Sequence, residues 1–205
     1  MRIAVLGLYN SGSTALAGVL HHLGVHMGGP PFFADYYEPL DVGTELRRWW
    51  KEPDLVESTA ADIRVRWLAD WLALKEDAGF AAIGIKHPLL CLSAPDVEQA
   101  WGDGVCYIWS KRGLDDSIAG LKRRNWYAHP AAMQNKLWNA LNRFTANHEH
   151  LEIEYSELLE KPQATIDRLV QSLQLSPDEN QVAAAAASIT PAVMVGPGTS
   201  HPRFY

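Results

Sequence analysis

The stretch GLYNSGST, residues 7–14, follows directly on the apolar run RIAVL over residues 2–6. Apolar side chains at positions 16, 19, 20 and 23 then recur at helical spacing, so this stretch joins a buried strand to a helix. Its glycines have the G-x4-G spacing of a phosphate-binding loop, in which the backbone turns tightly and amides at the helix start point at the anion. We therefore predict a phosphate-cradling loop within the first 25 residues of an α/β domain of nucleotide-binding type.

The hydroxyl groups of Ser11, Ser13 and Thr14 are expected to add hydrogen-bond donors to this loop. The alternative is a Gly/Ser turn in which Ser13 or Thr14 only caps the helix. Ser13 stands where the Walker-type NTPases have the lysine that holds the β- and γ-phosphates. Transfer of a γ-phosphoryl group is therefore disfavoured, and a nucleotide whose phosphate carries another group fits better.

Strand-like and helix-like patterns alternate along the rest of the chain. Apolar runs at 80–86, 105–109 and 151–155 predict three further strands, and helices are expected over about 59–76, 95–101, 114–121, 133–144 and 166–173. Such alternation predicts a three-layer αβα architecture with a central parallel sheet, of the P-loop nucleotide-hydrolase kind. We expect one domain over residues 1–205, with a Pro- and aromatic-rich excursion at 28–56 that holds one helix near Thr44–Lys51, and a C-terminal loop at 190–205.

Composition narrows the class of protein. With 205 residues, 47% of them hydrophobic and 20% charged, the chain suits a single soluble globular domain. Its net charge of −6 argues against general binding to nucleic acid or membrane surfaces. No apolar run approaches the roughly 20 residues of a membrane span, and no signal peptide precedes the first strand, so a cytoplasmic location is expected. The two cysteines lie in apolar runs and are expected to be buried thiols.

Four segments, in order, resemble the sulfotransferases that use 3′-phosphoadenosine-5′-phosphosulfate. The likeness spans roughly residues 3–175. Residues 10–16 (NSGSTAL) are similar to [K/R]-S-G-[T/S]-T-x-L, residues 84–89 (GIKHPL) to G-x-K-D-P-R, residues 111–120 (KRGLDDSIAG) to R-D-P-L-D-S-x-x-S, and residues 154–162 (EYSELLEKP) to Y-E-D-L-L-x-x-P. The resemblance implies transfer of a sulfuryl group from this nucleotide donor, without a metal ion.

The resemblance also implies roles for individual residues. Residues 10–14, which are Asn10, Ser11, Gly12, Ser13 and Thr14, would wrap the 5′-phosphosulfate. Arg112 would grip the 3′-phosphate, and Tyr155 would contact adenine, although packing in the core is the alternative for this ring.

Four residues depart from the pattern of the family. Asn10 replaces a basic residue that faces the leaving phosphate, and Gly120 replaces a serine beside Arg112. His87 and Leu89 replace the Asp and the Arg of the bacterial segment. Ser117, one helical turn before Gly120, is a partial substitute for that serine. Because a neutral amide cannot neutralise the charge on a departing nucleotide, these changes bear on the rate rather than on the fold.

The residues themselves suggest candidate catalytic groups at strand ends. Lys86 ends an apolar strand, where open α/β sheets bind ligands, and is the candidate cation; a surface lysine is the alternative. His87 follows it, and an ordinary pKa of about 6.5 would suit a general base, unless it is a structural histidine before Pro88. Glu38 is the rival base, with a solvated loop carboxylate as the alternative. The five histidines at 21, 22, 26, 148 and 150 lack partners at metal spacing, so no metal site is expected.

These observations favour a sulfotransferase acting on a hydroxyl or amine of a small-molecule, lipid or carbohydrate acceptor. The first rival is a P-loop nucleotide kinase or NTPase, and the second is a nucleotide-binding protein of the same fold with weakened catalysis. Aromatic side chains in the excursion suggest a partly aromatic acceptor cleft, and they are Phe32, Phe33, Tyr36, Tyr37, Trp49 and Trp50. The sequence specifies neither the acceptor nor the oligomeric state.

Overall fold

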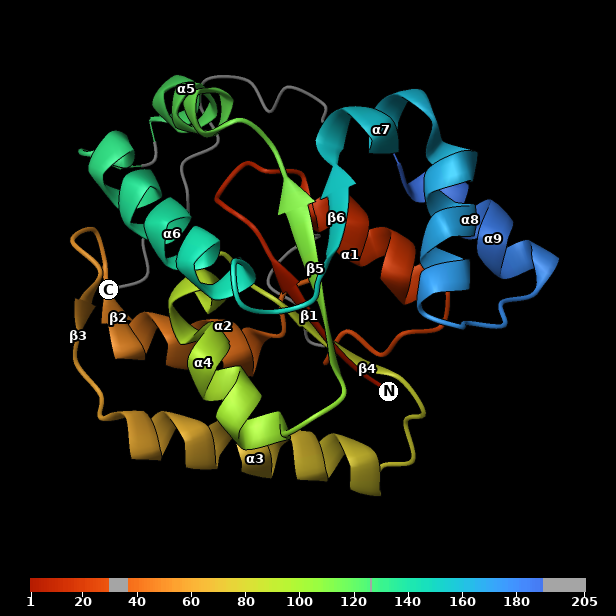
Figure 1. Cartoon of the computed structure of the whole chain (residues 1–205), viewed down its shortest axis with the longest axis horizontal. Coiled ribbons are helices and arrows are strands. Elements are labelled where there is room, and N and C mark those ends of the chain that lie inside the picture. Colours follow the sequence, from red (N-terminus) through yellow and green to blue (C-terminus); the bar gives the residue numbers. More distant parts are fainter. Residues whose placement is uncertain (30–36, 126, 190–205) are drawn as a thin grey trace.

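The centre of the fold is a four-stranded parallel sheet, seen in a computed structural model that describes residues 1–29, 37–125 and 127–189 (Figure 1). The strand order is β4-β1-β5-β6. The strands are β1 (Arg2–Leu6), β4 (Ile83–Lys86), β5 (Val105–Lys111) and β6 (Leu151–Glu154). The predicted three-layer αβα fold with a central parallel sheet is confirmed.

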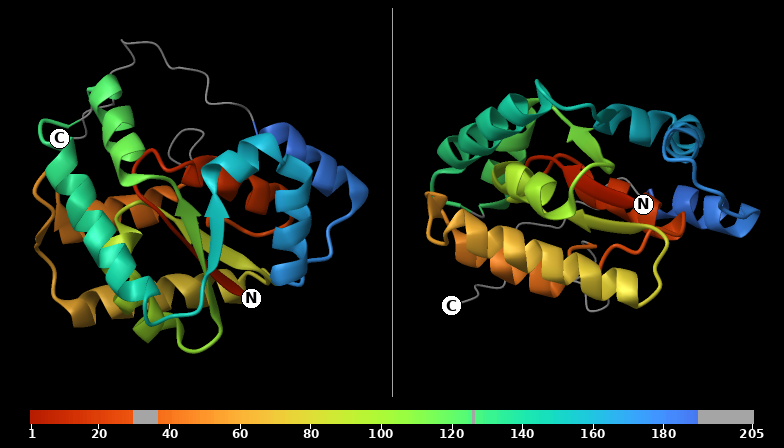
Figure 2. Two further views of the ribbon diagram at one scale, coloured as in Figure 1. Left: turned by 45° about the horizontal axis from the view of Figure 1, so that its top comes forward. Right: turned by 60° about the horizontal axis from the view of Figure 1, so that its bottom comes forward.

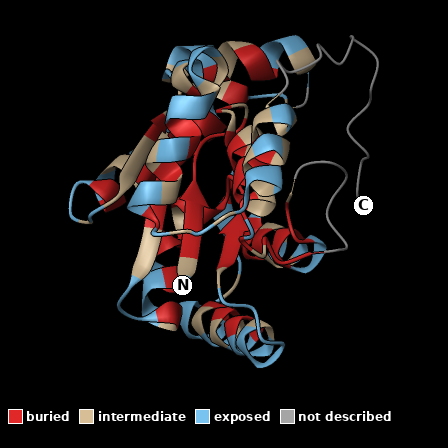
Figure 3. Ribbon diagram, turned by 90° about the vertical axis from the view of Figure 1, so that its right-hand side faces the viewer, coloured by how far each residue is buried: buried red, intermediate tan, exposed pale blue. Residues whose placement is uncertain are grey.

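Side chains of β1 alternate between two hydrophobic cores, one on each face of the sheet. Ala4 and Leu6 pack in the core with helices α2, α3, α4 and α6, whereas Ile3 and Val5 pack in the core with α1, α8 and α9. The two groups of helices therefore cover opposite faces (Figures 1 and 2). Figure 3 shows the buried strands between helices whose outer faces are exposed. The helices are α1 (Ser13–His22), α2 (Leu40–Trp49), α3 (Ala61–Asp77), α4 (Leu90–Trp101), α5 (Leu114–Arg124), α6 (Pro130–Thr145), α7 (Tyr155–Glu160), α8 (Pro162–Ser172) and α9 (Glu179–Ser188).

Several boundaries differ from the sequence-based prediction. Helix α4 begins at Leu90 rather than at residue 95, because it is buried between α3, α6 and the sheet and its sequence therefore lacks an amphipathic period. Helix α2 covers Leu40–Trp49 instead of a region near Thr44–Lys51, and a short hairpin of β2 (Trp50–Lys51) and β3 (Val56–Glu57) follows it. Strand β4 begins only at Ile83, since Phe80 is exposed before the strand pairs with β1. The predicted loop over 190–205 lies outside the described residues.

Among the residues that the structure describes, no helix has both the length and the apolar character needed to cross a bilayer. Cys91 and Cys106 are free thiols, the first fully buried and the second half-buried.

Candidate active site

The phosphate loop lies at the carboxyl end of β1 and leads into α1, as predicted. Gly12 is the N-cap residue of α1 with φ 90°, a left-handed conformation that glycine adopts without steric cost. Among the residues that the structure describes, no side chain caps this helix, so the interpretation of Ser13 or Thr14 as a mere cap is wrong. The first amides of α1 therefore remain available to an anion.

The backbone of the loop is held from outside by three side chains. The carbonyl oxygens of residues 9–11 accept hydrogen bonds from Gln134 at 2.7 Å, Arg112 at 3.0 Å and Ser110 at 3.3 Å, in that order. Gln134 lies on α6 and is fully buried, while Ser110 and Arg112 come from the end of β5. Since these carbonyl groups are engaged on the outside, the loop is preorganised before any ligand binds.

The hydroxyl groups of the loop have different environments. Ser11 is buried, and its Oγ would lie 2.7 Å from a Cβ on Gly7, so this hydroxyl faces the interior rather than a ligand. Ser13 is also buried. Thr14 is half-buried, and its Oγ1 accepts a hydrogen bond from Lys86. Thr14 is therefore the loop hydroxyl that connects with the predicted catalytic cation.

Lys86 lies at the centre of a buried group of charges. Its Nζ donates to Thr14 Oγ1 at 3.0 Å and to Glu38 Oε1 at 2.7 Å, and the residue is only 2% exposed. The alternatives of a surface lysine and of a solvated loop carboxylate are therefore wrong. Glu38 and Lys86, which are 48 positions apart in the sequence, meet at the end of β4, beside the phosphate loop.

The carboxylate of Glu38 lies close to the positive groups of both Lys86 and Arg47. Its Oε2 lies 4.0 Å from Arg47 and 3.9 Å from His87 Nε2. Burial acts to raise the pKa of Glu38, but the charge of Lys86, with a smaller effect from Arg47, outweighs it and holds the pKa below its ordinary value. Glu38 is thus ionised at neutral pH.

His87 is buried in its neutral form. Burial lowers its pKa to about 3, and the charges of Arg47 and Lys86 act in the same direction against the opposing effect of Glu38. Its Nδ1 accepts a hydrogen bond from the amide of Leu89 at 3.1 Å, so the neutral ring carries its proton on Nε2, toward Glu38. His87 is only 1% exposed, and its Nε2 lies 3.9 Å from Glu38 without a hydrogen bond among the described residues, so the role of general base stays a prediction.

Arg112 lies on the other side of the loop from this charge cluster. Its guanidinium lies 4.9 Å from the centre of the Tyr155 ring, and no ion pair engages it within the described part of the chain. Its neighbour Lys111, by contrast, is paired with Glu152 at 2.7 Å and Glu154 at 3.3 Å. Most of the N–H donors of Arg112 are therefore open to an incoming anion.

Tyr155 begins α7 and lies against the phosphate loop. A Cβ on Gly12 would lie 2.2 Å from Tyr155 Cδ2, so the ring requires glycine at position 12 in addition to the backbone conformation. The ring is half-buried between this backbone and the guanidinium of Arg112. It is therefore not a residue of the interior core.

Asn10 and Gly120, two of the departures from the sulfotransferase pattern, are in contact. A Cβ on Gly120 would lie 1.6 Å from Asn10 Nδ2, so the side chain of Asn10 occupies the space beside α5 that the glycine leaves. Asn10 has φ 62°, a left-handed conformation that asparagine tolerates. Ser117, the expected substitute for the missing serine, is fully buried instead.

Sequence reasoning missed a second polar group behind the loop. The hydroxyls of Tyr9 and Tyr127 both donate to Glu52 Oε1, and the Tyr9 ring makes an edge contact with His87. Burial raises the pKa of Tyr9, so it stays protonated and holds Glu52. Arg47 was missed as well, because a charged residue on an amphipathic helix normally faces solvent and gives no signal of a site.

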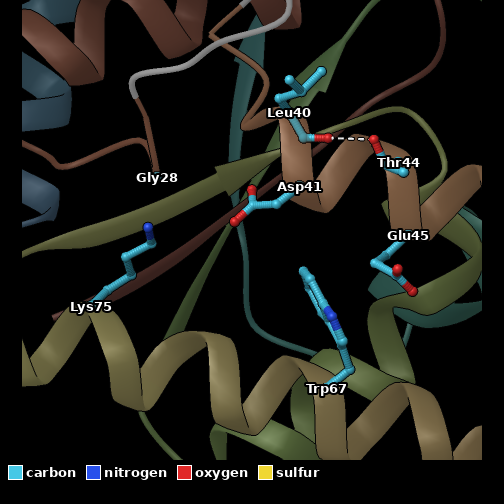
Figure 4. A pocket seen from close by; sticks show the side chains of 7 residues that line it. All are labelled: Gly28, Leu40, Asp41, Thr44, Glu45, Trp67 and Lys75. Carbon is cyan, nitrogen blue, oxygen red and sulfur yellow. Dashed lines mark hydrogen bonds between the residues drawn. The ribbon is translucent and has the colours of Figure 1, made fainter.

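The predicted aromatic cleft is not formed by the rings that the structure describes. Trp49 is fully buried against Trp67, the indole of Trp50 donates to buried Ser93, and Tyr37 packs against His21. Phe32, Phe33 and Tyr36 lie outside the described residues. An open hollow of about 390 Å³ lies instead between α2 and α3 (Figure 4), and it is lined by Gly28, Leu40, Asp41, Thr44, Glu45, Trp67 and Lys75. Within residues 1–29, 37–125 and 127–189, no three His, Cys, Asp or Glu side chains gather as a metal site would require.

Comparison with solved structures identifies the fold as sulfotransferase-like. The sulfotransferase domain of the curacin biosynthetic pathway has a TM-score of 0.59 at 18% identity over 92% of this chain and 82% of that chain. The sulfotransferase domain of the olefin synthase of Synechococcus PCC 7002 has a TM-score of 0.58 at 16% identity, over 93% of this chain and 80% of that chain.

A sugar kinase from Janibacter sp. HTCC2649 has the same general fold, with a TM-score of 0.52 at 16% identity over 93% of this chain and 98% of that chain. No protein-family model matches the sequence, and no curated protein matches it. At these identities the likeness establishes the fold, and the reaction must be argued from the site.

Proposed function

We propose that this protein is a sulfotransferase that moves a sulfuryl group from 3′-phosphoadenosine-5′-phosphosulfate to a hydroxyl or amine of an acceptor. The observation that carries the proposal is the position of Lys86, whose ammonium bonds both Thr14 of the phosphate loop and the carboxylate of Glu38. A cation is thereby held beside the phosphate site, next to a carboxylate that can take a proton.

The donor fits the groups present. The outward-held carbonyls of residues 9–11 and the uncapped start of α1 leave backbone amides for a 5′-phosphosulfate. Arg112, with open donors, is assigned to the 3′-phosphate, and the Tyr155 ring beside it to the adenosine. Residues 10–14 form the 5′ site, in which Ser11 contributes its backbone rather than its hydroxyl.

The nucleotide supplies an activated sulfuryl group, and the protein supplies position and charge. As the acceptor oxygen or nitrogen bonds to sulfur, the bond from sulfur to the phosphate oxygen breaks and its electron pair stays on the phosphate. Lys86 offsets the charge that grows there. Glu38 is the better placed of the two candidate bases, because it is ionised and less enclosed than His87, which is neutral and lies 3.9 Å from it.

The acceptor is proposed only as a class: a small molecule, lipid or carbohydrate with a free hydroxyl or amine. The hollow between α2 and α3 is lined in part by residues of α2, the helix that also carries Arg47. Arg47 lies 4.0 Å from Glu38. A kinase is disfavoured by Ser13 at the position of the Walker lysine, although the fold also resembles that of the Janibacter sugar kinase.

Adenosine 3′,5′-bisphosphate is expected to raise the melting temperature of the protein more than adenosine 5′-phosphate or ATP does, because it engages both the loop and Arg112. Thermal melts at equal ligand concentrations, with and without Mg²⁺, measure this. Equal shifts for the three nucleotides contradict the donor assignment, and a larger shift with Mg²⁺ and ATP favours the kinase. Bisphosphate binding without turnover on any acceptor indicates a protein with weakened catalysis.

Arg112→Ala is expected to weaken binding of the bisphosphate by about 1.5–3 kcal/mol, the contribution of a hydrogen bond to a charged group. Binding of adenosine 5′-phosphate should change little, because Arg112 touches the loop through the carbonyl of Asn10 only. Lys111→Ala is the matched control, since Lys111 is already paired with two glutamates. Calorimetric titration measures both ligands; an equal loss for the two means that Arg112 supports the loop instead.

A further inference from the structure

We infer that the side chain of Asn10 is the second donor of the anion site at Arg112, and that Asn10 and Gly120 form a matched pair that sets the preference for a bisphosphorylated nucleotide. The inference rests on the proposed function, and it gives Asn10 a role away from the leaving group. It follows from contacts on the α5 side of the phosphate loop.

The first observation is the direction of the Asn10 side chain. Its amide nitrogen lies 1.6 Å from where the Cβ of any other residue at position 120 would stand. Gly120 is buried in the middle of α5, so its missing side chain leaves a space beside the loop. Asparagine fills that space with a group that donates two hydrogen bonds.

The second observation is the link between Asn10 and Arg112. Arg112 donates to the backbone carbonyl oxygen of Asn10 at 3.0 Å, so the guanidinium contacts the same residue whose side chain turns toward Gly120. Both residues are half-buried, and neither is joined to a carboxylate among the residues described. A charged and a neutral donor group are therefore carried by two residues in contact, and the described residues show no carboxylate that engages either of them.

The position of this pair separates it from Lys86. Strand β1 lies between β4, which ends in Lys86, and β5, which precedes α5. The side chain of Asn10 turns toward α5, whereas Thr14 turns toward Lys86. Asn10 is thus placed to act on a group bound near Arg112, and the charge beside Thr14 comes from Lys86.

A serine at position 120 is the alternative way to place a hydrogen-bond donor in this space. It would carry a hydroxyl from α5 into the space that the Asn10 amide now fills, and the two side chains exclude each other sterically. Asn10 can be changed to Gly without backbone strain, because its φ is 62°. Exchange of the donor from residue 10 to residue 120 is therefore a direct test.

The experiment measures the ratio of affinities for adenosine 3′,5′-bisphosphate and adenosine 5′-phosphate. Asn10→Asp keeps the shape but puts a carboxylate beside Arg112, so the preference for the bisphosphate should fall about 10-fold or more. Gly120→Ser should also reduce the preference, because it displaces the amide. The double variant Asn10→Gly/Gly120→Ser should restore most of it, a non-additive result expected of a coupled pair.

Asn147→Asp is the matched control for the added charge, since Asn147 is exposed just beyond the far end of α6. Melting of the empty proteins separates packing effects from binding. A preference that Asn10→Asp leaves unchanged, or variants whose effects simply add, would overturn the inference while the proposed donor stands. Absence of any preference in the unaltered protein would overturn both.

Discussion

Lys86→Met is expected to reduce turnover at least 10²–10³-fold, the effect of removing one group aimed at developing charge. Lys86 is the cation that contacts both the phosphate loop and the carboxylate beside it. Affinity for adenosine 3′,5′-bisphosphate should change much less, because the loop amides and Arg112 remain. Single-turnover rates on a working acceptor, together with calorimetric titration, separate the two effects.

The control for Lys86→Met must deal with the buried carboxylate of Glu38, which the substitution leaves with the more distant Arg47 at 4.0 Å. Removing one partner of a buried ion pair typically costs about 3–5 kcal/mol, so unfolding is a second route to loss of activity. Lys86→Met combined with Glu38→Gln removes both charges and should melt closer to the unaltered protein, yet stay inactive. Asn10→Lys should not raise turnover, because the side chain at position 10 starts on the α5 side. Unchanged activity in Lys86→Met would refute this placement of the leaving-group cation.

The sheet and the loop between β1 and α1 were predictable because their signals are local. An apolar run, two glycines at fixed spacing and a helical period all lie within residues 2–23, and each is a direct consequence of backbone geometry. Lys86 and His87 were found for a similar reason, as polar residues directly after a buried strand. The start of helix α4 was mispredicted where the local signal fails, since residues 90–94 are covered and show no polar face, whereas Glu98 and Gln99 near the end of the helix are exposed.

The partners of the site residues were not predictable, because they depend on contacts between distant segments. Glu38 reaches Lys86 across 48 positions, and Gln134 reaches the carbonyl of Tyr9 across 125. No spacing rule connects such pairs. The same holds for Asn10 and Gly120: each looks like a loss of function in the sequence, and only the packing of α5 against the loop shows that one fills the space of the other.

Glu38→Gln is expected to lower the free energy of unfolding at neutral pH by about 3–5 kcal/mol. The substitution removes the carboxylate to which Lys86 donates at 2.7 Å and so takes the counter-charge of Glu38 away from a buried ammonium. Glutamine keeps the volume and one acceptor oxygen, so the loss reports charge rather than a cavity. Urea unfolding measures it, and Glu38→Gln with Lys86→Met should recover much of the difference.

The pH dependence gives an independent check on Glu38. Its pKa in the folded protein lies below the ordinary value of 4.5, so the ionised carboxylate stabilises the fold above about that pH. As the pH falls below 4.5 toward the folded pKa, the unfolded chain takes up the proton first and this stabilisation is lost. The gap in unfolding free energy between the unaltered protein and Glu38→Gln should therefore be widest near neutral pH and narrow below 4.5. A gap independent of pH would mean that Glu38 stabilises the site by packing, and that its charge is not what holds Lys86 in place.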